Sequence, residues 1–322
     1  MTQFTTFVGI DVSKATLDVY IHPEGMQSCF ANTPAGHKSL TQTLRRHAKT
    51  GPVAVAFEAS GGYERMLGAA LSVPVLVKAG ITAFQLDASQ ARSFARAERQ
   101  RAKTDRIDAA MIARAVMALH ESMTPYRHDK DAEKLVEHLR LRDIHVDQIV
   151  QFKTSLENIQ DAALRRIISS QIRTLQKSIV LVETLIRSLI AADPARAARD
   201  RQMQSVPGIG PIVSATLIGR LPELGSLSSR EVAAMVGVAP YDNRSGKRTG
   251  AKRCSGGRPA VRRVLYLAAL CVVRMKAGAL RAVYDRLMAN GKPFKVALNA
   301  VMRKMVVALN AMIAHDTTWH AA

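Results

Sequence analysis

Residues 7–21 read FVGIDVSKATLDVYI and predict two β-strands that begin a sheet. Residues 7–12 form an apolar run, and residues 16–21 alternate with the period of two that is typical of a half-buried strand. Only three residues, SKA, separate the two segments, so together they predict a β-hairpin.

The residues after the hairpin predict an α/β domain, in which helices cover a mixed sheet. Strands come first and further strands then alternate with helices, which favours this architecture. We expect the domain to span residues 1–125. The expected strands are residues 27–31, 52–59 and 74–78, and the expected helices are residues 36–48, 63–71, 83–99 and 105–119.

Long helices are predicted for residues 126–195. Apolar residues recur there at alternating spacings of three and four, the pattern of a coiled coil or an antiparallel helical pair. We interpret this segment as a spacer or dimerisation arm. A third, mainly α-helical domain is expected at residues 196–322. The residues of the apolar seam are Ile172, Leu175, Ile179, Val182, Ile186 and Leu189.

The composition of the chain indicates a polyanionic partner. Of its 322 residues, 46 are Lys or Arg and 26 are Asp or Glu, which gives a net charge of +20. A folded chain keeps so much self-repelling charge most often because it binds nucleic acid. Aromatic residues make up only 5%, so contacts to the nucleic-acid backbone are favoured over base stacking.

A cytoplasmic protein without membrane association is expected. The longest apolar runs, such as residues 264–273, are about half as long as a membrane span, and no signal-peptide pattern begins the sequence. Cys29, Cys254 and Cys271 are scattered without a metal-ligand spacing, which fits a reducing compartment and argues against a zinc site.

Four acidic residues on apolar elements are candidate metal ligands. Asp11 and Glu58 lie at the ends of two apolar strands, and Asp105 and Asp108 share one face at a helix start. Each alone is equally consistent with a turn cap or with a favourable charge at a helix N-terminus. Together at one sheet edge they would repel one another without a cation, and they could hold two Mg²⁺ ions for phosphodiester chemistry.

Two segments of the C-terminal region are candidates for phosphate binding. Residues 205–211 (SVPGIGP) offer free backbone N–H groups for phosphate, or they simply join two packed helices. Residues 243–263 (NRSGKRTGAKRCSGGRPAVRR) contain eight Arg or Lys and no acidic residue, and from residue chemistry alone their serines are either nucleophilic or part of a flexible basic loop. The expected nucleic-acid contacts are Lys103, Gly208, Gly210, Arg244, Lys247, Arg248, Lys252, Arg253, Arg262 and Arg263.

An ordered set of motifs resembles the DEDD transposases of bacterial insertion sequences, and more narrowly the bridge-RNA-guided recombinases. The motifs are GIDVSK, FEAS, GGY, KTDRIDA, VPGIG, VGVAP and RSG, and they cover nearly the whole chain. The resemblance implies an RNase H/RuvC-like domain, a coiled-coil spacer and a C-terminal transposase domain. The chain departs from many relatives at LDASQARSF (residues 86–94), where they carry an Asn-Pro-type turn.

The resemblance also implies a mechanism and partners. Ser245, which precedes Gly246 downstream of VGVAP, would be the nucleophile and form a covalent phosphoserine with DNA, with Ser255 as the second choice. Its activation would come from the DEDD metal ions of a neighbouring protomer. The implied partners are double-stranded donor and target DNA and a structured noncoding guide RNA. The implied assembly is a homodimer that becomes a tetramer on synapsis.

Two other functions stay open at this stage. In a metal-dependent nuclease of the junction-resolvase type, the four carboxylates would activate water and Ser245 would not react. In a non-catalytic nucleic-acid-binding protein, the same carboxylates would be structural only.

Overall fold

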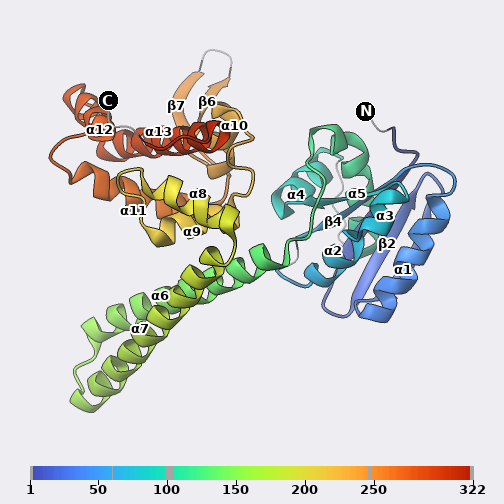
Figure 1. Cartoon of the computed structure of the whole chain (residues 1–322), viewed down its shortest axis with the longest axis horizontal. Coiled ribbons are helices and arrows are strands. Elements are labelled where there is room, and N and C mark those ends of the chain that lie inside the picture. Colours follow the sequence, from blue (N-terminus) through green and yellow to red (C-terminus); the bar gives the residue numbers. More distant parts are fainter. Residues whose placement is uncertain (1–2, 60, 99–104, 246–247, 320–322) are drawn as a thin grey trace. The chain divides into compact units, whose positions relative to one another are not determined.

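The chain is described here by a computed structural model, which covers residues 3–59, 61–98, 105–245 and 248–319. The side chains of residues 88–89, 105–106, 242–245 and 248–252 lie outside this description. The chain forms two compact units, Met1–Asp129 and Lys130–Ala322 (Figure 1).

The first unit contains a five-stranded mixed sheet with the strand order β3-β2-β1-β4-β5. β1 pairs with β2 antiparallel and with β4 parallel, so the predicted hairpin is confirmed and the sheet continues from it by parallel strands. The strands are β1 (Thr6–Val12), β2 (Thr16–His22), β3 (Met26–Ala31), β4 (Val53–Glu58) and β5 (Ile81–Leu86).

Helices cover both faces of this sheet, as predicted for the α/β domain (Figure 1). On one face the apolar side chains of α1 (Pro34–His47), α2 (Arg65–Leu71) and α3 (Pro74–Lys78) pack against those of β1, β2 and β4. On the other face α4 (Ala88–Ala97) and α5 (Asp105–Leu119) pack against β4 and β5. The short 3₁₀ turn His120–Ser122 follows α5.

Two of the predicted elements are wrong. Pro74–Lys78 is the helix α3, not a strand, because proline fixes the backbone at its first position and only Leu76 of the five residues is buried. The strand lies at Ile81–Leu86, where a helix starting at residue 83 was expected. β5 is covered by helices on both faces, so its apolar residues do not alternate and its sequence resembles a buried helix as much as a strand.

The second unit begins with two long helices, α6 (Lys130–Asn158) and α7 (Ala162–Ala191), which lie side by side (Figure 1). Asp161 caps α7 by accepting hydrogen bonds from the N–H groups of Ala163 (2.7 Å) and Leu164 (2.9 Å). The predicted apolar seam of α7 is buried or half-buried at every position. The long helices are confirmed, whereas a coiled coil and a role in dimerisation stay predictions.

The rest of the second unit is mainly helical and surrounds one core. Within it, buried Asn310 accepts a hydrogen bond from Gly225 N–H (2.9 Å) and donates one to the carbonyl of Leu227 (2.6 Å). The elements are α8 (Pro194–Gln204), α9 (Pro211–Arg220), α10 (Ser229–Val236), β6 (Pro240–Ser245), β7 (Arg248–Cys254), α11 (Pro259–Val273), α12 (Ala279–Ala289) and α13 (Phe294–His315). Because α6 and α7 belong to the same compact unit as these elements, the division at residues 195 and 196 stays a prediction.

α13 is long and apolar enough to cross a membrane by composition alone, with a mean hydropathy of 1.5. Half of its apolar window is buried, and Val301, Met305 and Leu309 are fully covered by other elements of the unit. Its apolar character is therefore explained by its place in the core.

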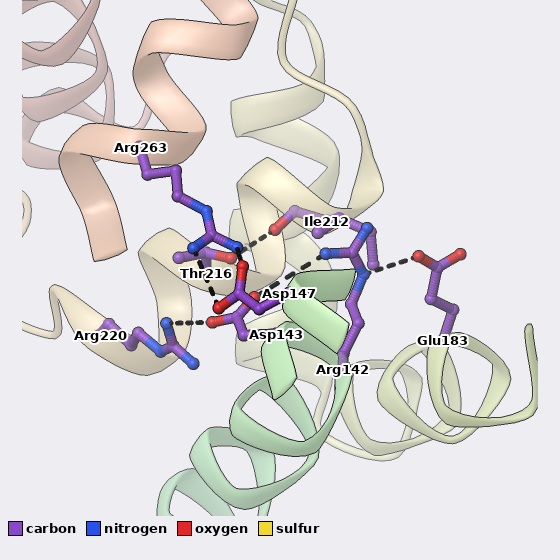
Figure 2. A network of polar contacts seen from close by, with 8 residues as sticks. All are labelled: Arg142, Asp143, Asp147, Glu183, Ile212, Thr216, Arg220 and Arg263. Atoms are coloured by element: carbon purple, nitrogen blue, oxygen red, sulfur yellow. Dashed lines mark hydrogen bonds and ion pairs between the residues drawn. The ribbon is translucent and has the colours of Figure 1, made fainter. Parts of the chain in front are cut away.

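Ion pairs fasten α6 to three other helices of the second unit (Figure 2). Asp143 of α6 accepts a hydrogen bond from Arg220 of α9 at 2.7 Å, and Arg142 donates one to Glu183 of α7 at 2.7 Å. Asp147 pairs with Arg263 of α11 at 3.0 Å. The first two pairs are largely shielded from solvent, so they contribute more to the attachment of α6 than the exposed third pair.

Candidate active site

Asp11 and Glu58 are neighbours at the carboxyl edge of the sheet. β1 and β4 run parallel, and their last aligned pair is Ile10 with Phe57, so the two acids come next on adjacent strands. Side chains alternate between the faces of a strand. Ala56 packs on the α5 side of the sheet, and Glu58, two residues further along β4, therefore points to that side.

The backbone of α5 lies directly on β1 at Gly9. A Cβ atom at this position would collide with the main chain of Ala109 and Ala113. Near the other end of α5, the ring of His120 is 5.3 Å from that of Phe4 and 5.5 Å from that of Phe7. α5 therefore runs from the carboxyl edge of β1, where Asp11 lies, back toward its amino edge.

This direction brings the start of α5 to the level of Asp11. Asp11 lies about 6–7 Å beyond Gly9 along the strand, and about four residues of helix cover the same distance. The first turn of α5, which carries Asp105 and Asp108, begins four residues before Ala109. Asp11, Glu58 and Asp108 are each half-buried, and the side chain of Asp105 lies outside the described atoms.

The residues of this edge fit Mg²⁺ by their chemistry. All four candidates are carboxylates, and hard divalent cations prefer oxygen ligands. Among the side chains that the structure describes, no three His, Cys, Asp or Glu are grouped closely enough to hold a metal ion. Asp11, Glu58 and Asp108 are among those side chains and do not form such a group, and the side chain of Asp105 lies outside the described atoms. The metal site therefore stays a prediction.

Asp18 is a further carboxylate at this place, and the sequence analysis missed it. The antiparallel ladder aligns Asp18 of β2 directly with Asp11 of β1. The alternation of the two strands already implied a shared face, because Val12 and Leu17 both face the core, so the neighbouring Asp11 and Asp18 both point to the other side of the sheet. Like charges directly opposite each other on one sheet face are destabilising.

Ser245 lies at the end of β6, in a two-stranded antiparallel hairpin that extends away from the surrounding helices of its unit (Figure 1). Its partner across the ladder is Arg248, and Arg244 is aligned with Thr249. Gly246 and Lys247, which connect the strands, lie outside the described residues, as does Lys103. The backbone therefore places Ser245 next to the hairpin connection, between positions occupied by arginines.

The base of this hairpin is held tightly. Gly237 and Gly257 both have positive φ, at 79° and 71°, and a Cβ atom on either would collide with the backbone across the base. Arg258 reaches from the start of α11 to both carboxylate oxygens of Glu223, at 2.7 and 2.6 Å. Ser255 is exposed at this anchored base, so the two candidate serines occupy different ends of the hairpin.

Two of the predicted phosphate-binding arginines have partners within the protein. Arg262 donates a hydrogen bond to the carbonyl of Gly256 at 2.6 Å, and Arg263 pairs with Asp147 at 3.0 Å. Arg253 is exposed. The structure thus gives Arg262 and Arg263 a structural contact, and nucleic-acid binding by the basic residues of this segment stays a prediction.

The two glycines of the SVPGIGP turn differ in what the fold requires of them. Gly208 has a φ of 85°, and a Cβ atom there would lie 2.6 Å from the carbonyl oxygen of Ala268 in α11. Gly210 has an ordinary φ of −95°, and nothing lies within 4 Å of where its Cβ would be. Gly210 is the N-cap residue of α9 without a capping side chain, so the helix N-terminus behind it is open to a ligand.

Comparison with known proteins identifies two family matches. A DEDD-type family model of IS110 elements, described as a transposase, matches residues 8–165. A second model, described as the transposase IS116/IS110/IS902 family, matches residues 200–285. The first match includes all four DEDD candidates, and the second includes Ser245 and the glycines of the turn.

Relatives and a solved structure were also found. The pilin gene-inverting proteins of Moraxella bovis and Moraxella lacunata are each 26% identical over 315 residues, covering 96% of this chain and 95% of theirs. The RuvC structure of Thermus thermophilus aligns with 38% of this chain and 99% of its own, at 14% identity and a TM-score of 0.27.

We predict that Asp18→Asn stabilises the protein when divalent cations are absent. Removing the charge opposite Asp11 should raise the free energy of unfolding by about 0.2–1 kcal/mol in EDTA. Addition of Mg²⁺ should stabilise the wild type and narrow this difference, because a bound cation offsets the same repulsion. Urea unfolding in both buffers measures the effect, and a variant less stable than the wild type in EDTA would contradict it.

The Glu223–Arg258 pair generates a prediction about pH. Burial acts to raise the pKa of Glu223, but the hydrogen bond and charge of Arg258 outweigh it and hold the pKa below its ordinary value of 4.5. The stabilisation is therefore present above pH 4.5 and is lost as the pH falls through the lower folded-state pKa. Because the pair is partly exposed, Glu223→Gln should lower the free energy of unfolding by only about 1–2 kcal/mol at neutral pH. The loss should become smaller as the pH falls.

Denaturant unfolding of the wild type and Glu223→Gln from neutral to acidic pH tests this expectation. Glu157→Gln is the control at an exposed position of α6. If the difference in the free energy of unfolding between wild type and Glu223→Gln grew toward acidic pH, the ion pair would not be what holds the hairpin base.

The two glycines of the turn should respond oppositely to substitution. Gly210→Ser adds a capping side chain, so stability should stay equal or rise by a few tenths of a kcal/mol, while duplex DNA binding weakens roughly threefold or more. Gly208→Ala should instead lower stability by about 1–3 kcal/mol, through its positive φ and its contact with Ala268. Unchanged DNA affinity of Gly210→Ser in a salt-matched titration would mean that the turn only joins two helices.

Proposed function

Since the chain belongs to the family of DEDD transposases of IS110-type insertion sequences, we propose that it is a site-specific recombinase that cuts and rejoins donor and target DNA through Ser245. The observation that carries this proposal is the place of Ser245, at the free end of a hairpin whose base is anchored by Arg258 and Glu223. A nucleophile that must reach a phosphate in bound DNA suits such a position. The basic residues around it suit the phosphate.

The carboxylate edge of the first unit would hold the metal ions. Asp11 and Glu58 lie at the carboxyl ends of adjacent parallel strands, and positions 105 and 108 belong to the first turn of α5. When bound there, Mg²⁺ would neutralise charge on the phosphate and lower the pKa of the attacking hydroxyl group. We propose that the first unit is an RNase H/RuvC-like domain and that this edge binds two metal ions.

In the proposed reaction the Oγ atom of Ser245 attacks the scissile phosphorus. The Oγ–P bond forms, the bond from phosphorus to a deoxyribose oxygen breaks, the serine loses its proton and the leaving oxygen gains one. The phosphoserine keeps the energy of the phosphodiester, so a hydroxyl of the second DNA can reverse the step without ATP. Arg244 and Arg248 flank Ser245 in the strand register and would bind the phosphate oxygens.

The carboxylates and the serine would act on the same phosphate although they belong to different units of the chain. We propose that they meet between protomers, the carboxylates of one completing the active site around Ser245 of another. A dimer, and a tetramer when two DNA molecules are synapsed, follows from that sharing.

A water-using nuclease is the second candidate, because DEDD carboxylates by themselves can activate water at a phosphodiester. In that case Ser245 would form no bond to DNA, and the hairpin would serve as a phosphate clamp. Membership in a transposase family argues against the third function considered above, a non-catalytic binding protein.

Partners follow from charge and from the relatives. Residues 130–322 carry 31 Lys and Arg against 15 Asp and Glu, whereas residues 1–129 carry 15 against 11, so most of the excess charge is in the second unit. The two Moraxella relatives are named for inverting a gene, which is a rearrangement of DNA. We propose double-stranded DNA as substrate and a structured noncoding RNA as guide, so that base pairing supplies specificity, in the bacterial cytoplasm.

A trapping experiment tests the nucleophile. Wild type, Ser245→Ala and Ser255→Ala are incubated with Mg²⁺, labelled donor and target DNA and the RNA transcribed from the flank of the element, then separated on a denaturing gel. A protein–DNA adduct should form with wild type and Ser255→Ala and disappear with Ser245→Ala and in EDTA. Cut DNA that Ser245→Ala produces as well as wild type would show that water is the nucleophile.

A further inference from the structure

A basic depression of about 510 Å³ lies at the C-terminal end of α1, in the first unit. Its lining combines three cationic side chains, one amide and two small residues that leave room for a ligand. The lining residues are Gln42, Arg45, Arg46, Ala48, Lys49 and Ala79.

The cations of this depression are held in place by the fold. Leu40 and Leu44 are fully buried in the core of the unit and fix α1 on the sheet. Beyond the helix, the N–H of Lys49 donates to the carbonyl of Arg46 at 3.2 Å, which keeps the chain turned at the helix end. This turn brings Lys49 to the depression that Arg45 and Arg46 also line.

No acidic residue of the described chain neutralises these side chains. Arg45, Arg46 and Lys49 are exposed, and none of them forms an ion pair with another residue that the structure describes. Glu24 reaches this end of α1 but pairs with His47 at 3.5 Å. Three uncompensated cations around one depression repel one another, and an anion that binds among them relieves that repulsion.

The helix dipole explains only part of this arrangement. Cations in the last turn of a helix are stabilising by about 0.3–1 kcal/mol, and this accounts for the presence of Arg45 and Arg46. It does not account for Lys49, which lies past the helix, or for the small residues Ala48 and Ala79 that leave the depression open.

The depression lies at the opposite edge of the sheet from the carboxylates. Lys49 leads through Gly51 and Pro52 into the start of β4, and Ala79 is followed by Gly80 and the start of β5. Glu58 is the last residue of β4, about 17 Å from its start by the rise of a strand. A ligand in the depression is therefore distinct from the phosphate at the proposed metal site.

We propose that the depression binds backbone phosphates of a second nucleic-acid segment, held away from the segment that is cut. The lining contains arginines, a lysine and an amide but no aromatic residue, so it suits phosphates and not unstacked bases. Structured RNA and duplex DNA present the same phosphate chemistry. The inference rests on the proposed function only in taking nucleic acid as the partner.

The test removes the three charges together in the full-length protein, as Arg45→Gln, Arg46→Gln and Lys49→Gln. Binding to a duplex DNA oligomer and to a stem-loop RNA is titrated over a range of salt concentrations. For the probe that the depression binds, affinity should fall about tenfold. The slope of log K against log salt should become less steep by about two to three, because each lost phosphate contact changes the slope by about 0.9 for duplex DNA and about 0.7 for single strands. The probe that shows the change identifies the source of the phosphates.

A matched variant controls for the general loss of charge. Lys153→Gln, Arg173→Gln and Lys177→Gln remove the same charge from exposed positions on α6 and α7 that do not line the depression. This control triple should change the slope of log K against log salt by less than half of the change that the Arg45, Arg46 and Lys49 triple causes. Equal changes in the two triples, or an unchanged slope for both probes in the first, would overturn the proposal.

Two further readouts keep the result interpretable. Melting temperatures of both triples should stay close to that of the wild type, because the substituted side chains are exposed. The yield of the Ser245 adduct at saturating DNA and saturating RNA should stay unchanged in the Arg45, Arg46 and Lys49 triple. If the wild type forms no adduct, the proposed chemistry fails while the salt slopes still decide whether the depression binds nucleic acid.

Discussion

The approach of α5 to β1 at Gly9 is the contact on which the carboxylate edge depends. Because Gly9 has no side chain, the main chain of Ala109 and Ala113 lies against the strand. Any larger residue would displace the helix from the sheet and carry Asp108 away from Asp11. The aromatic contacts of His120 at the far end set the direction of the helix, so its first turn and not its last one meets the carboxyl ends of β1 and β4.

The sequence predicts the strands and the helix that form this edge because their signals are local. The apolar strands that end in Asp11 and Glu58, and the i, i+3 spacing of Asp105 and Asp108, need no knowledge of distant contacts. β5 could not be predicted in the same way. It is covered on both faces, so its apolar pattern lacks the alternation that distinguishes a strand from a helix, and only its pairing with β4 decides its structure.

Asp18 illustrates a signal that was present and not used. The apolar residues of both strands mark one face of the hairpin, so the acids between them share the other face, where the ladder places Asp18 opposite Asp11. Contacts between elements distant in sequence were beyond prediction altogether. Arg263 pairs with Asp147, 116 residues away, and Glu223 holds Arg258 at the base of the hairpin, although sequence alone assigned only phosphate contacts to this basic stretch.

The central claim is that Ser245 of one protomer and the carboxylates of another act on one phosphate. The most direct measurement mixes full-length Asp11→Asn with full-length Ser245→Ala, each carrying a tag of different size, with DNA, guide RNA and Mg²⁺. Neither variant alone should form a covalent adduct. The account predicts that the mixture forms one, and only on the Asp11→Asn chain, which keeps its serine. A mixture that stays inactive, while the wild type forms the adduct under the same conditions, would contradict it.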